Sequence, residues 1–313
     1  MTADITAPAP PIPWPDGKRC AVSFSFDMDA DALIHIARPD DANTCVSTMS
    51  GMRYGPEIGV PRICDLFESY GLKVSFFVPA WCAEEHPQVI ERMVEGGHEI
   101  AHHGYMHESP SRNTRDREAY WTVRALDSLE RLTGKRPVGY RAPLYDYSQH
   151  TTAILAELGF RYESSLMGDD LPYVLRSRSG DLLELPVDWA CDDWNQFCHL
   201  ADIDFVMPIQ SPRHAFDVYR AEFEGQYEIG GFWQIVWHPF LIGRAARMRY
   251  VRSFIEELLE KGDVWLTNCI AVADHVEGLI AAGNYTPRVD TMPIKSSAHR
   301  IPELAEDVEP LRG

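Results

Sequence analysis

Short apolar runs alternate with amphipathic segments along most of this 313-residue chain, and that alternation limits the fold more than any other feature. Each run has the length and composition of a buried strand, and the segments between them carry apolar residues at helical spacing. Strands separated by helices favour a parallel sheet, and eight such units suit a closed or nearly closed barrel better than an open sheet. We therefore predict an α/β barrel with strands at residues 20–26, 73–80, 98–103, 138–143, 160–165, 181–189, 232–240 and 263–268.

Glycines and polar capping residues mark the ends of the expected helices. We expect Asn113 to cap a long helix that ends at Gly134, and Ser148 to open a shorter helix that ends at Gly159. The other expected helices cover residues 61–71, 86–97, 211–225, 243–262 and 270–283.

The two ends of the chain lack this periodicity. Residues 1–19 are rich in Pro and Ala and are expected to form an extended N-terminal arm. Residues 284–313 are polar and aperiodic, so we expect a docking tail or a partly disordered segment. Residues 20–283 then form a single barrel domain.

A formal net charge of −18 limits the classes of partner. Nucleic acid and anionic membranes favour clustered Lys and Arg, so we expect neither to bind, and a small neutral or cationic molecule is the better candidate. The N-terminal residues have neither the basic start nor the apolar core of a signal peptide, and no stretch approaches the roughly 20 apolar residues of a membrane span. We expect a cytoplasmic protein.

The seven cysteines are scattered and form no C-x-x-C pair. An odd and dispersed set favours reduced, mostly buried thiols over a disulfide framework. A catalytic cysteine is the alternative, but none lies in a stretch typical of a nucleophile.

Polar side chains follow several of the expected strands, which is where the active sites of parallel barrels lie. Asp27 and Asp29 lie at the end of the first strand, Arg141 ends the fourth, and His238 lies near the end of the seventh. Carboxylates, imidazoles and one Arg therefore converge on one end of the predicted barrel. The segment around the end of the sixth strand adds Asp188, Asp192, Asp193 and Trp194.

The stretch HEIAHHGYMHE, which begins at His98, contains four histidines, and their spacing decides which two can share a metal ion. His98 and His102 would lie within a strand, where residues four apart are separated by roughly 13 Å. His103 and His107 follow the strand, and a turn at Gly104 can bring them together. With one carboxylate they would leave open positions on a divalent metal. The alternative is that these histidines only make local hydrogen bonds.

Five motifs occur in order along the chain: FSFDMDA, GHEIAHHGYMH, YRAP, VDWACDDW and WHPF. Together they resemble the motifs of the polysaccharide deacetylase family, also called the NodB homology family, over about residues 20–270. The resemblance implies a distorted (β/α) barrel of seven or eight strands. Stretches such as HHGYMHESP and YESSLMGDDLPY resemble the branch that contains cyclic imide hydrolases, allantoinase-like proteins and a peptidoglycan deacetylase-like protein.

The resemblance also implies a role for each motif residue. Asp29, His103 and His107 would bind one divalent metal ion, with Zn²⁺ as the first choice and Co²⁺, Mn²⁺ or Fe²⁺ as alternatives. Most members of the family have two adjacent aspartates in the first motif, whereas FDMDA separates them, and Asp31 adds a carboxylate without an assigned role. The other implied roles are the catalytic base Asp27, its partner Arg141, the general acid His238, and one of Asp192 and Asp193 as the partner of that histidine.

The substrate pocket is expected to contain aromatic and apolar residues in or beside the motifs, namely Trp194, Pro143 and Tyr105. Several other tryptophans lie within apolar strand or helix patterns and are expected to pack in the core. These are Trp121, Trp189, Trp233, Trp237 and Trp265.

The implied roles describe hydrolysis of a non-peptide amide C–N bond without a covalent enzyme intermediate. The branch favours the opening of a small cyclic imide, amide or ureide. N-deacetylation of a saccharide is the alternative, and a noncatalytic ligand-binding barrel is a more remote one. The branch further implies a homo-oligomer whose neighbouring subunits help to shape the pocket.

Overall fold

A computed structural model describes residues 12–294, so the parts of the expected arm and tail at residues 1–11 and 295–313 lie outside the described residues. Its main feature is a ten-stranded sheet. The strands are β1 (Cys20–Asp27), β2 (Ser75–Val78), β3 (Glu99–His102), β4 (Gly139–Tyr140), β5 (Tyr162–Glu163), β6 (Tyr173–Ser177), β7 (Gly180–Glu184), β10 (Phe232–Trp237), β11 (Val264–Thr267) and β12 (Val289–Thr291). Their order is β10-β1-β2-β3-β4-β5-β7-β6-β12, and β11 also pairs with β1.

All eight predicted strands are present, and each pairs in parallel with a neighbour. The prediction of an α/β fold with a mostly parallel sheet is therefore confirmed. The sequence patterns did not predict β6, which is antiparallel to β7, or β12, which pairs with β6 from within the expected tail. They also missed a separate hairpin of β8 (His199–Leu200) and β9 (Phe205–Val206).

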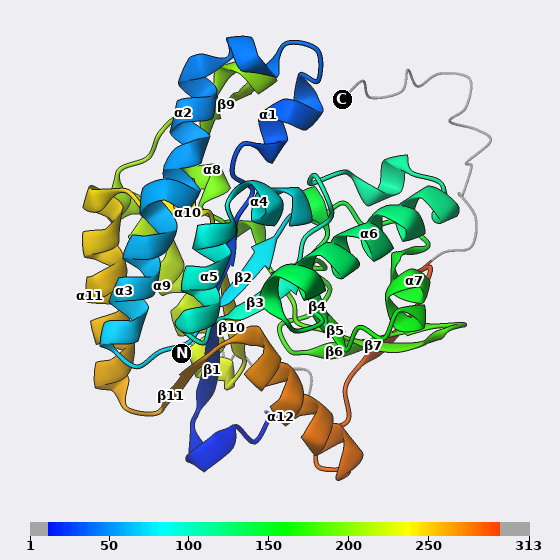
Figure 1. Ribbon diagram of the computed structural model, residues 1–313. Coiled ribbons are helices and arrows are strands. Elements are labelled where there is room, and N and C mark those ends of the chain that lie inside the picture. Colours follow the sequence, from blue (N-terminus) through cyan, green and yellow to red (C-terminus); the bar gives the residue numbers. More distant parts are fainter. Residues whose placement is uncertain (1–11, 295–313) are drawn as a thin grey trace, which may run out of the picture.

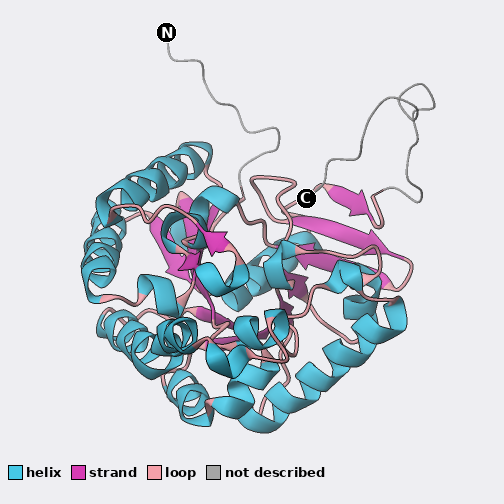
Figure 2. Cartoon of the chain, turned by 90° about the horizontal axis from the view of Figure 1, so that it is seen from above, coloured by secondary structure: helices cyan, strands magenta, loops and turns pink. Residues whose placement is uncertain are grey.

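Helices lie around the outside of most of the strands, as the view from above shows, and one edge of the sheet has no helix of the described chain outside it (Figure 2). No helix among residues 12–294 is long and apolar enough to cross a membrane. The α-helices are α1 (Ala32–Ala37), α2 (Val46–Tyr54), α3 (Val60–Ser69), α4 (Ala80–Glu85), α5 (Pro87–Glu95), α6 (Arg115–Thr133), α7 (Thr151–Glu157), α8 (Trp194–Phe197), α9 (Pro212–Ile229), α10 (Pro239–Ile242), α11 (Ala245–Lys261) and α12 (Cys269–Ala281), and a π-helical segment (Gly55–Gly59) joins α2 to α3.

The curled sheet does not close through a continuous ladder among the described residues. β10 stands at one end of the strand order, and β6 and β12 lie at the other end beyond β7. One isolated parallel bridge joins Asp192, in the segment after β7, to Val236 of β10. The arrangement agrees with a distorted barrel that has a seam between β7 and β10.

The central strand β1 is buried along its whole length and separates two kinds of environment. Phe24 and Phe26 point toward the helices, where both rings pack on Phe67 of α3 at centroid distances of 4.9 and 5.7 Å. The alternate residues Ser25 and Asp27 belong to the opposite face, as the two-residue period of a strand requires. The chain thereby places polar residues of β1 on the inner face of the curled sheet and aromatic residues on the face covered by α3. Figure 1 shows β1 at the centre of the strands.

Two expected helix starts differ from the structure. Thr114, and not Asn113, caps α6, because the Thr114 hydroxyl accepts the backbone N–H of Arg117 while the Asn113 amide donates to the Ser109 carbonyl. Ser148 lies before α7, where its hydroxyl accepts the N–H of the residue at the cap position, His150. In both helices the cap position therefore lies one or two residues after the polar residue expected there.

The aromatic contact between β1 and α3 generates a stability prediction. Replacing Phe67 by Ala removes a fully buried ring and leaves a cavity, so the free energy of unfolding should fall by about 3–5 kcal/mol. Denaturant unfolding measures this loss. Val46→Ala, at a position that is 70% exposed, is the control and should change the same quantity by no more than about 0.5 kcal/mol. Equal effects of the two changes would contradict the assigned core.

Candidate active site

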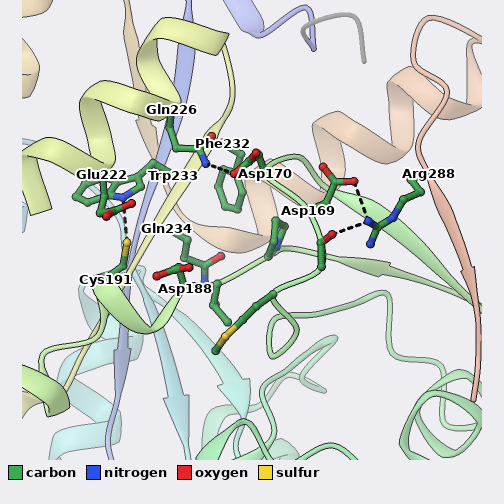
Figure 3. A pocket seen from close by; sticks show the side chains of 14 residues that line it. Asp169, Asp170, Asp188, Cys191, Glu222, Gln226, Phe232, Trp233, Gln234 and Arg288 are labelled. Atoms are coloured by element: carbon green, nitrogen blue, oxygen red, sulfur yellow. Dashed lines mark hydrogen bonds and ion pairs between the residues drawn. The ribbon is translucent and has the colours of Figure 1, made fainter. Parts of the chain in front are cut away.

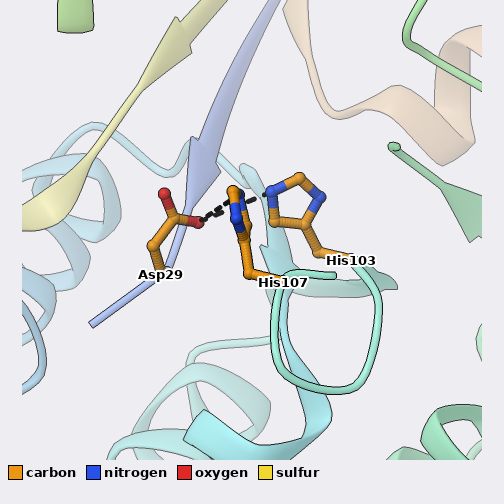
Figure 4. A group of neighbouring side chains, drawn as sticks. All are labelled: Asp29, His103 and His107. Atoms are coloured by element: carbon orange, nitrogen blue, oxygen red, sulfur yellow. Dashed lines mark ion pairs between the residues drawn. The ribbon is translucent and has the colours of Figure 1, made fainter. Parts of the chain in front are cut away.

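Asp29, His103 and His107 lie together beyond the ends of β1 and β3 (Figure 4). Their candidate ligand atoms are all within 4.8 Å of one another, and all three residues are buried. Nε2 of His103 lies 3.5 Å and Nε2 of His107 lies 3.6 Å from Oδ1 of Asp29. Two imidazoles and one carboxylate therefore face a common point. Spacing in the sequence predicted the histidine pair, and the family resemblance implied Asp29.

Unusual backbone conformations bring these three side chains together. Gly104 has a φ of +75°, and His107 has a φ of +65°, so the chain after β3 turns back on itself. Ala30, directly after Asp29, also has a positive φ, of +45°. A residue other than glycine at positive φ costs on the order of 1–3 kcal/mol, so the surrounding packing must hold Ala30 and His107 in place.

The donor set fits a metal cation. Neither carboxylate oxygen of Asp29 has a hydrogen-bond partner among the described residues, although both are buried. Nδ1 of His103 lies 2.8 Å from the Arg141 carbonyl oxygen and can donate to it, which leaves the Nε2 lone pair free to face Asp29. Burial alone would raise the pKa of Asp29, but the neighbouring His107 and His103 hold that pKa below its usual range.

Two other groups of potential ligands are less suited to a metal. In one of them, Arg92 donates to both carboxylate oxygens of Glu68 and so neutralises the acid beside Cys64 and His98. In the other, Asp193 is hydrogen-bonded to His238, and both oxygens of Asp192 accept from Tyr145 and Trp194. The Asp29 group is the one whose carboxylate has both oxygens available.

Asp27 is paired with Arg141 inside the barrel. Nη1 of Arg141 lies 2.5 Å from Oδ1 of Asp27, and the guanidinium is fully buried. Ser164 fixes the guanidinium from the other side, because its carbonyl accepts Nε–H at 2.8 Å and its hydroxyl accepts Nη2–H at 2.9 Å. Oδ2 of Asp27 faces the metal ligands, 3.7 Å from Nε2 of His103. The geometry predicted for these two residues is present.

His238 is held by Asp193, which answers a question that the sequence left open. Oδ1 of Asp193 lies 2.8 Å from Nδ1 of His238 and also accepts the His238 backbone N–H at 2.9 Å. Nε2 of the ring lies 3.5 Å from Oδ2 of Asp29. Burial would lower the pKa of His238, but the Asp193 hydrogen bond and the Asp192 charge raise it above its ordinary value. The imidazolium form, which can donate a proton, is thereby favoured.

Asp192 has a different position from Asp193. Its Oδ2 accepts the Tyr145 hydroxyl at 2.7 Å, and its Oδ1 accepts the Trp194 backbone N–H at 2.7 Å. Its carboxylate lies 3.7 Å from His238 Nδ1, so it adds charge without a direct hydrogen bond. Asp192 therefore lies between His238 and Tyr145, which lines the adjoining pocket.

A pocket of about 350 Å³ opens onto these residues. Trp194 lines it as predicted, with its ring 5.2 Å from that of His238. Trp189 also lines it and is 48% exposed, so the prediction that this tryptophan packs in the core is wrong. The other apolar or polar wall residues, which the sequence analysis missed, are Ala142, Leu144, Tyr145, Asn195, Phe205 and Met207.

Tyr105 and Pro143 do not line this pocket, so their assignment to it was wrong. The Tyr105 ring stacks on Trp121 at 5.4 Å, and its hydroxyl donates to Glu84. These partners on α4 and α6 turn the ring away from the ligand cluster. Pro143 is buried against Gly104, where a Cβ on the glycine would lie 3.0 Å from the proline Cγ.

The remaining polar motif residues have local partners. Nε2 of His102 lies 3.1 Å from the Thr122 carbonyl oxygen, and its Nδ1 accepts the Gly104 N–H, as expected for a packing role. His98 accepts the Val74 N–H through Nδ1 at the entry to β3. Asp31 is buried and lies 3.4 Å from His86, away from the three proposed ligands.

Comparisons with known proteins agree with this geometry. The pattern of the polysaccharide deacetylase family matches residues 53–163. A solved structure from Mycobacterium smegmatis, described as a polysaccharide deacetylase, is 43% identical with a TM-score of 0.86, and the match covers 92% of this chain and 99% of that one. This chain belongs to the polysaccharide deacetylase family.

Other similar proteins have names that state different activities. The peptidoglycan deacetylase of Helicobacter pylori is 27% identical over 273 residues, which cover 79% of this chain and 93% of that protein. The solved structure of Puue allantoinase is 26% identical with a TM-score of 0.75, and the match covers 88% of this chain and 95% of that one. The predicted family is therefore confirmed, and this member is a hydrolase that acts on carbon–nitrogen bonds.

The turn at Gly104 generates a prediction that separates stability from site geometry. Gly104→Ala and Gly134→Ala both place a Cβ at a φ above +70°, so each should lower the free energy of unfolding by about 1–2 kcal/mol. Only Gly104 meets Pro143, and only its turn positions His103 and His107. Titration with Zn²⁺ should therefore show weaker binding for Gly104→Ala alone. Equal Zn²⁺ affinity in the two variants would contradict the role of this turn.

Proposed function

We propose that this protein is a metal-dependent hydrolase that opens a small cyclic imide, amide or ureide. One observation carries the proposal: a pocket of about 350 Å³ with largely apolar walls ends at the Asp29, His103 and His107 group. This volume is near the lower end of the roughly 300–1,000 Å³ range of ligand pockets. The aromatic side chains Trp189 and Trp194 would pack against a flat ring, whereas a sugar polymer would need a longer surface with many polar contacts.

The metal ligands in this proposal are Asp29, His103 and His107. When bound, a divalent ion supplies Lewis-acid activation of the substrate carbonyl and of water. Zn²⁺ is the first choice because two imidazoles and a carboxylate form a typical hydrolytic zinc set, and Co²⁺, Mn²⁺ and Fe²⁺ are alternatives.

The proposed base lies beside His103, and the proposed acid lies beside Asp29. Asp27 takes a proton from the attacking water through Oδ2, because Arg141 occupies Oδ1. His238 gives the proton on Nε2 to the departing nitrogen, because its Nδ1 is held by Asp193. The C–N bond breaks, the attacked carbonyl becomes a carboxylate, and the protonated nitrogen leaves as an amide from an imide, a urea group from a ureide or an amine from a cyclic amide. No covalent bond to the protein is needed.

A second candidate function is N-deacetylation of a saccharide. The specific observation in its favour is the name of the Helicobacter pylori relative, a peptidoglycan deacetylase, which is 27% identical to this chain. The catalytic residues would act identically on an N-acetyl group. The pocket walls, rather than the catalytic group, separate the two candidates.

A noncatalytic ligand-binding barrel is the remaining alternative. It would not require a base, an acid and three metal ligands to lie around one pocket, as Asp27, His238 and the Asp29 group do. The homo-oligomeric state and the cytoplasmic location stay predictions.

A substrate panel tests the proposed reaction. Succinimide-type rings, allantoin and N-acetylglucosamine oligomers are incubated with the metal-loaded protein, and ring opening or acetate release is measured. We expect turnover of at least one ring compound with a kcat/KM well above that for the oligomers. Turnover of the oligomers alone would contradict the ring-opening proposal and favour saccharide deacetylation.

Metal removal and two substitutions test the assigned roles. Chelation should abolish turnover, and added Zn²⁺ or Co²⁺ should restore it. His103→Ala should lose bound metal, whereas Asp27→Asn should retain metal but lower kcat by about 10²–10⁴-fold, since it removes a general base. Metal content and turnover are measured together. His214→Ala, on the exposed surface of α9, is the control and should retain both. A fully active, metal-free protein would contradict the mechanism.

A further inference from the structure

The active-site pocket has a polar floor and an apolar mouth. The proposed metal ligands, base and acid in its lining are buried, whereas three large apolar side chains of the same lining are exposed to solvent. These are Leu144 at 49%, Trp189 at 48% and Phe205 at 38% exposure, and we call them the apolar rim. A pocket of about 350 Å³ can bury a drug-sized ligand, so a bare imide ring at the floor leaves space beside the rim.

The rim side chains are held in place by the pocket walls. The ring of Trp189 lies edge-on to that of Tyr145 at a centroid distance of 4.7 Å. The ring of Phe205 lies edge-on to that of Trp194 at 5.1 Å. Leu144 and Tyr145 have φ values of +59° and +54°, which cost on the order of 1–3 kcal/mol for a residue other than glycine and persist only where surrounding contacts fix them. The rim is therefore a preformed surface, and a ligand need not order it on binding.

The pocket offers little to a charged or strongly polar substituent. Among the described residues, no Lys or Arg lines it, so a carboxylate on the ligand would find no basic side chain there. Two polar side chains of the walls already donate to the protein, the Tyr145 hydroxyl to Asp192 and the Asn195 amide to a backbone carbonyl. Burying a polar group without a hydrogen bond costs about 1–3 kcal/mol. An uncharged apolar substituent avoids this cost and removes the rim from water.

A second pocket, of about 380 Å³, shows that an apolar mouth is not a general feature of the hollows on this protein (Figure 3). It shares no lining residue with the active-site pocket. Its exposed lining residues include the carboxylates of Asp170, Asp188 and Glu222. The apolar rim is thus a property of the pocket that contains the proposed metal ligands.

We propose that the active-site pocket accepts a ring substrate that carries an uncharged apolar substituent, such as a phenyl group. The reacting carbonyl of the ring lies at the Asp29 group, and the substituent packs against the apolar rim. This inference rests on the function proposed above and narrows it, because rings with an apolar substituent are then better substrates than bare rings or than rings with a polar ureido substituent. The rim lies away from the reacting atoms, so its contribution appears mainly in KM.

The test compares rings that differ only in the substituent on a ring carbon. Succinimide is compared with phenylsuccinimide, and hydantoin with phenylhydantoin and with allantoin, which is hydantoin with a ureido substituent. Values of kcat and KM are measured with the metal-loaded protein. Binding of the same rings is measured by isothermal titration calorimetry with metal-loaded Asp27→Asn, so that affinities are obtained whether or not a ring is turned over.

The rim variant is Phe205→Ala. Its matched control is Val206→Ala, at the next residue of β9, which is 58% exposed and does not line the pocket. Light scattering measures the mass of each variant in solution, because an exposed apolar rim could instead be covered by a second copy of the chain.

We expect each phenyl compound to have a kcat/KM at least about tenfold above that of its bare ring, and allantoin to bind more weakly than phenylhydantoin. Phe205→Ala should raise the KM of the phenyl compounds at least about threefold and leave that of the bare rings unchanged, whereas Val206→Ala should change neither.

The outcomes separate this inference from the proposed function. Turnover of the rings without a preference for the phenyl group, or equal effects of the two variants, would overturn the inference and leave the proposed function standing. Absence of ring turnover would contradict the proposed function, and the calorimetric affinities would then decide whether the pocket prefers phenyl rings. A changed mass of Phe205→Ala with an unchanged preference would identify the rim as a contact between copies of the chain and would also overturn the inference.

Discussion

The buried ion pair between Arg141 and Asp27 is the interaction on which the active site depends. Removing one partner of such a pair leaves an uncompensated charge inside the protein and typically costs about 3–5 kcal/mol. Arg141 also connects the site, because Ser164 binds its side chain and His103 can donate to its carbonyl oxygen. Arg141, which directly follows β4, thus orients the proposed base, one proposed metal ligand and the segment after β5.

The strands could be predicted because fully buried strands consist almost entirely of apolar residues. β1, β2 and β10 are buried along their whole length and appear as nearly continuous apolar runs. β6 and β12 were missed because both are partly exposed, with Arg176 and Asp290 among their residues, and so lack that signal. The hairpin of β8 and β9 has only two residues per strand, too few for any periodicity.

The proposed catalytic residues could be selected from motifs, but the pocket walls could not. Spacing after a predicted strand singled out His103 and His107, whereas Asp29 was assigned through the family resemblance. Trp189 lies in a single 3-10 turn and Phe205 in the two-residue strand β9. Elements this short show no period in the sequence, so the direction of their side chains depends on distant partners. Tyr105 shows the same limit, because its stacking on Trp121 of α6 decides which way it points. A tyrosine just past a metal-ligand histidine gave no sign of that contact.

The central claim is that one divalent ion is bound by Asp29, His103 and His107. Anomalous diffraction from crystals of the purified protein, recorded at the absorption edge of the bound metal, tests it most directly. The account predicts one strong peak within bonding distance of a carboxylate oxygen of Asp29 and of Nε2 of both histidines, at roughly 2.0–2.2 Å for zinc. A peak at the Asp192, Asp193 and His238 group, or no peak in an active protein, would contradict it.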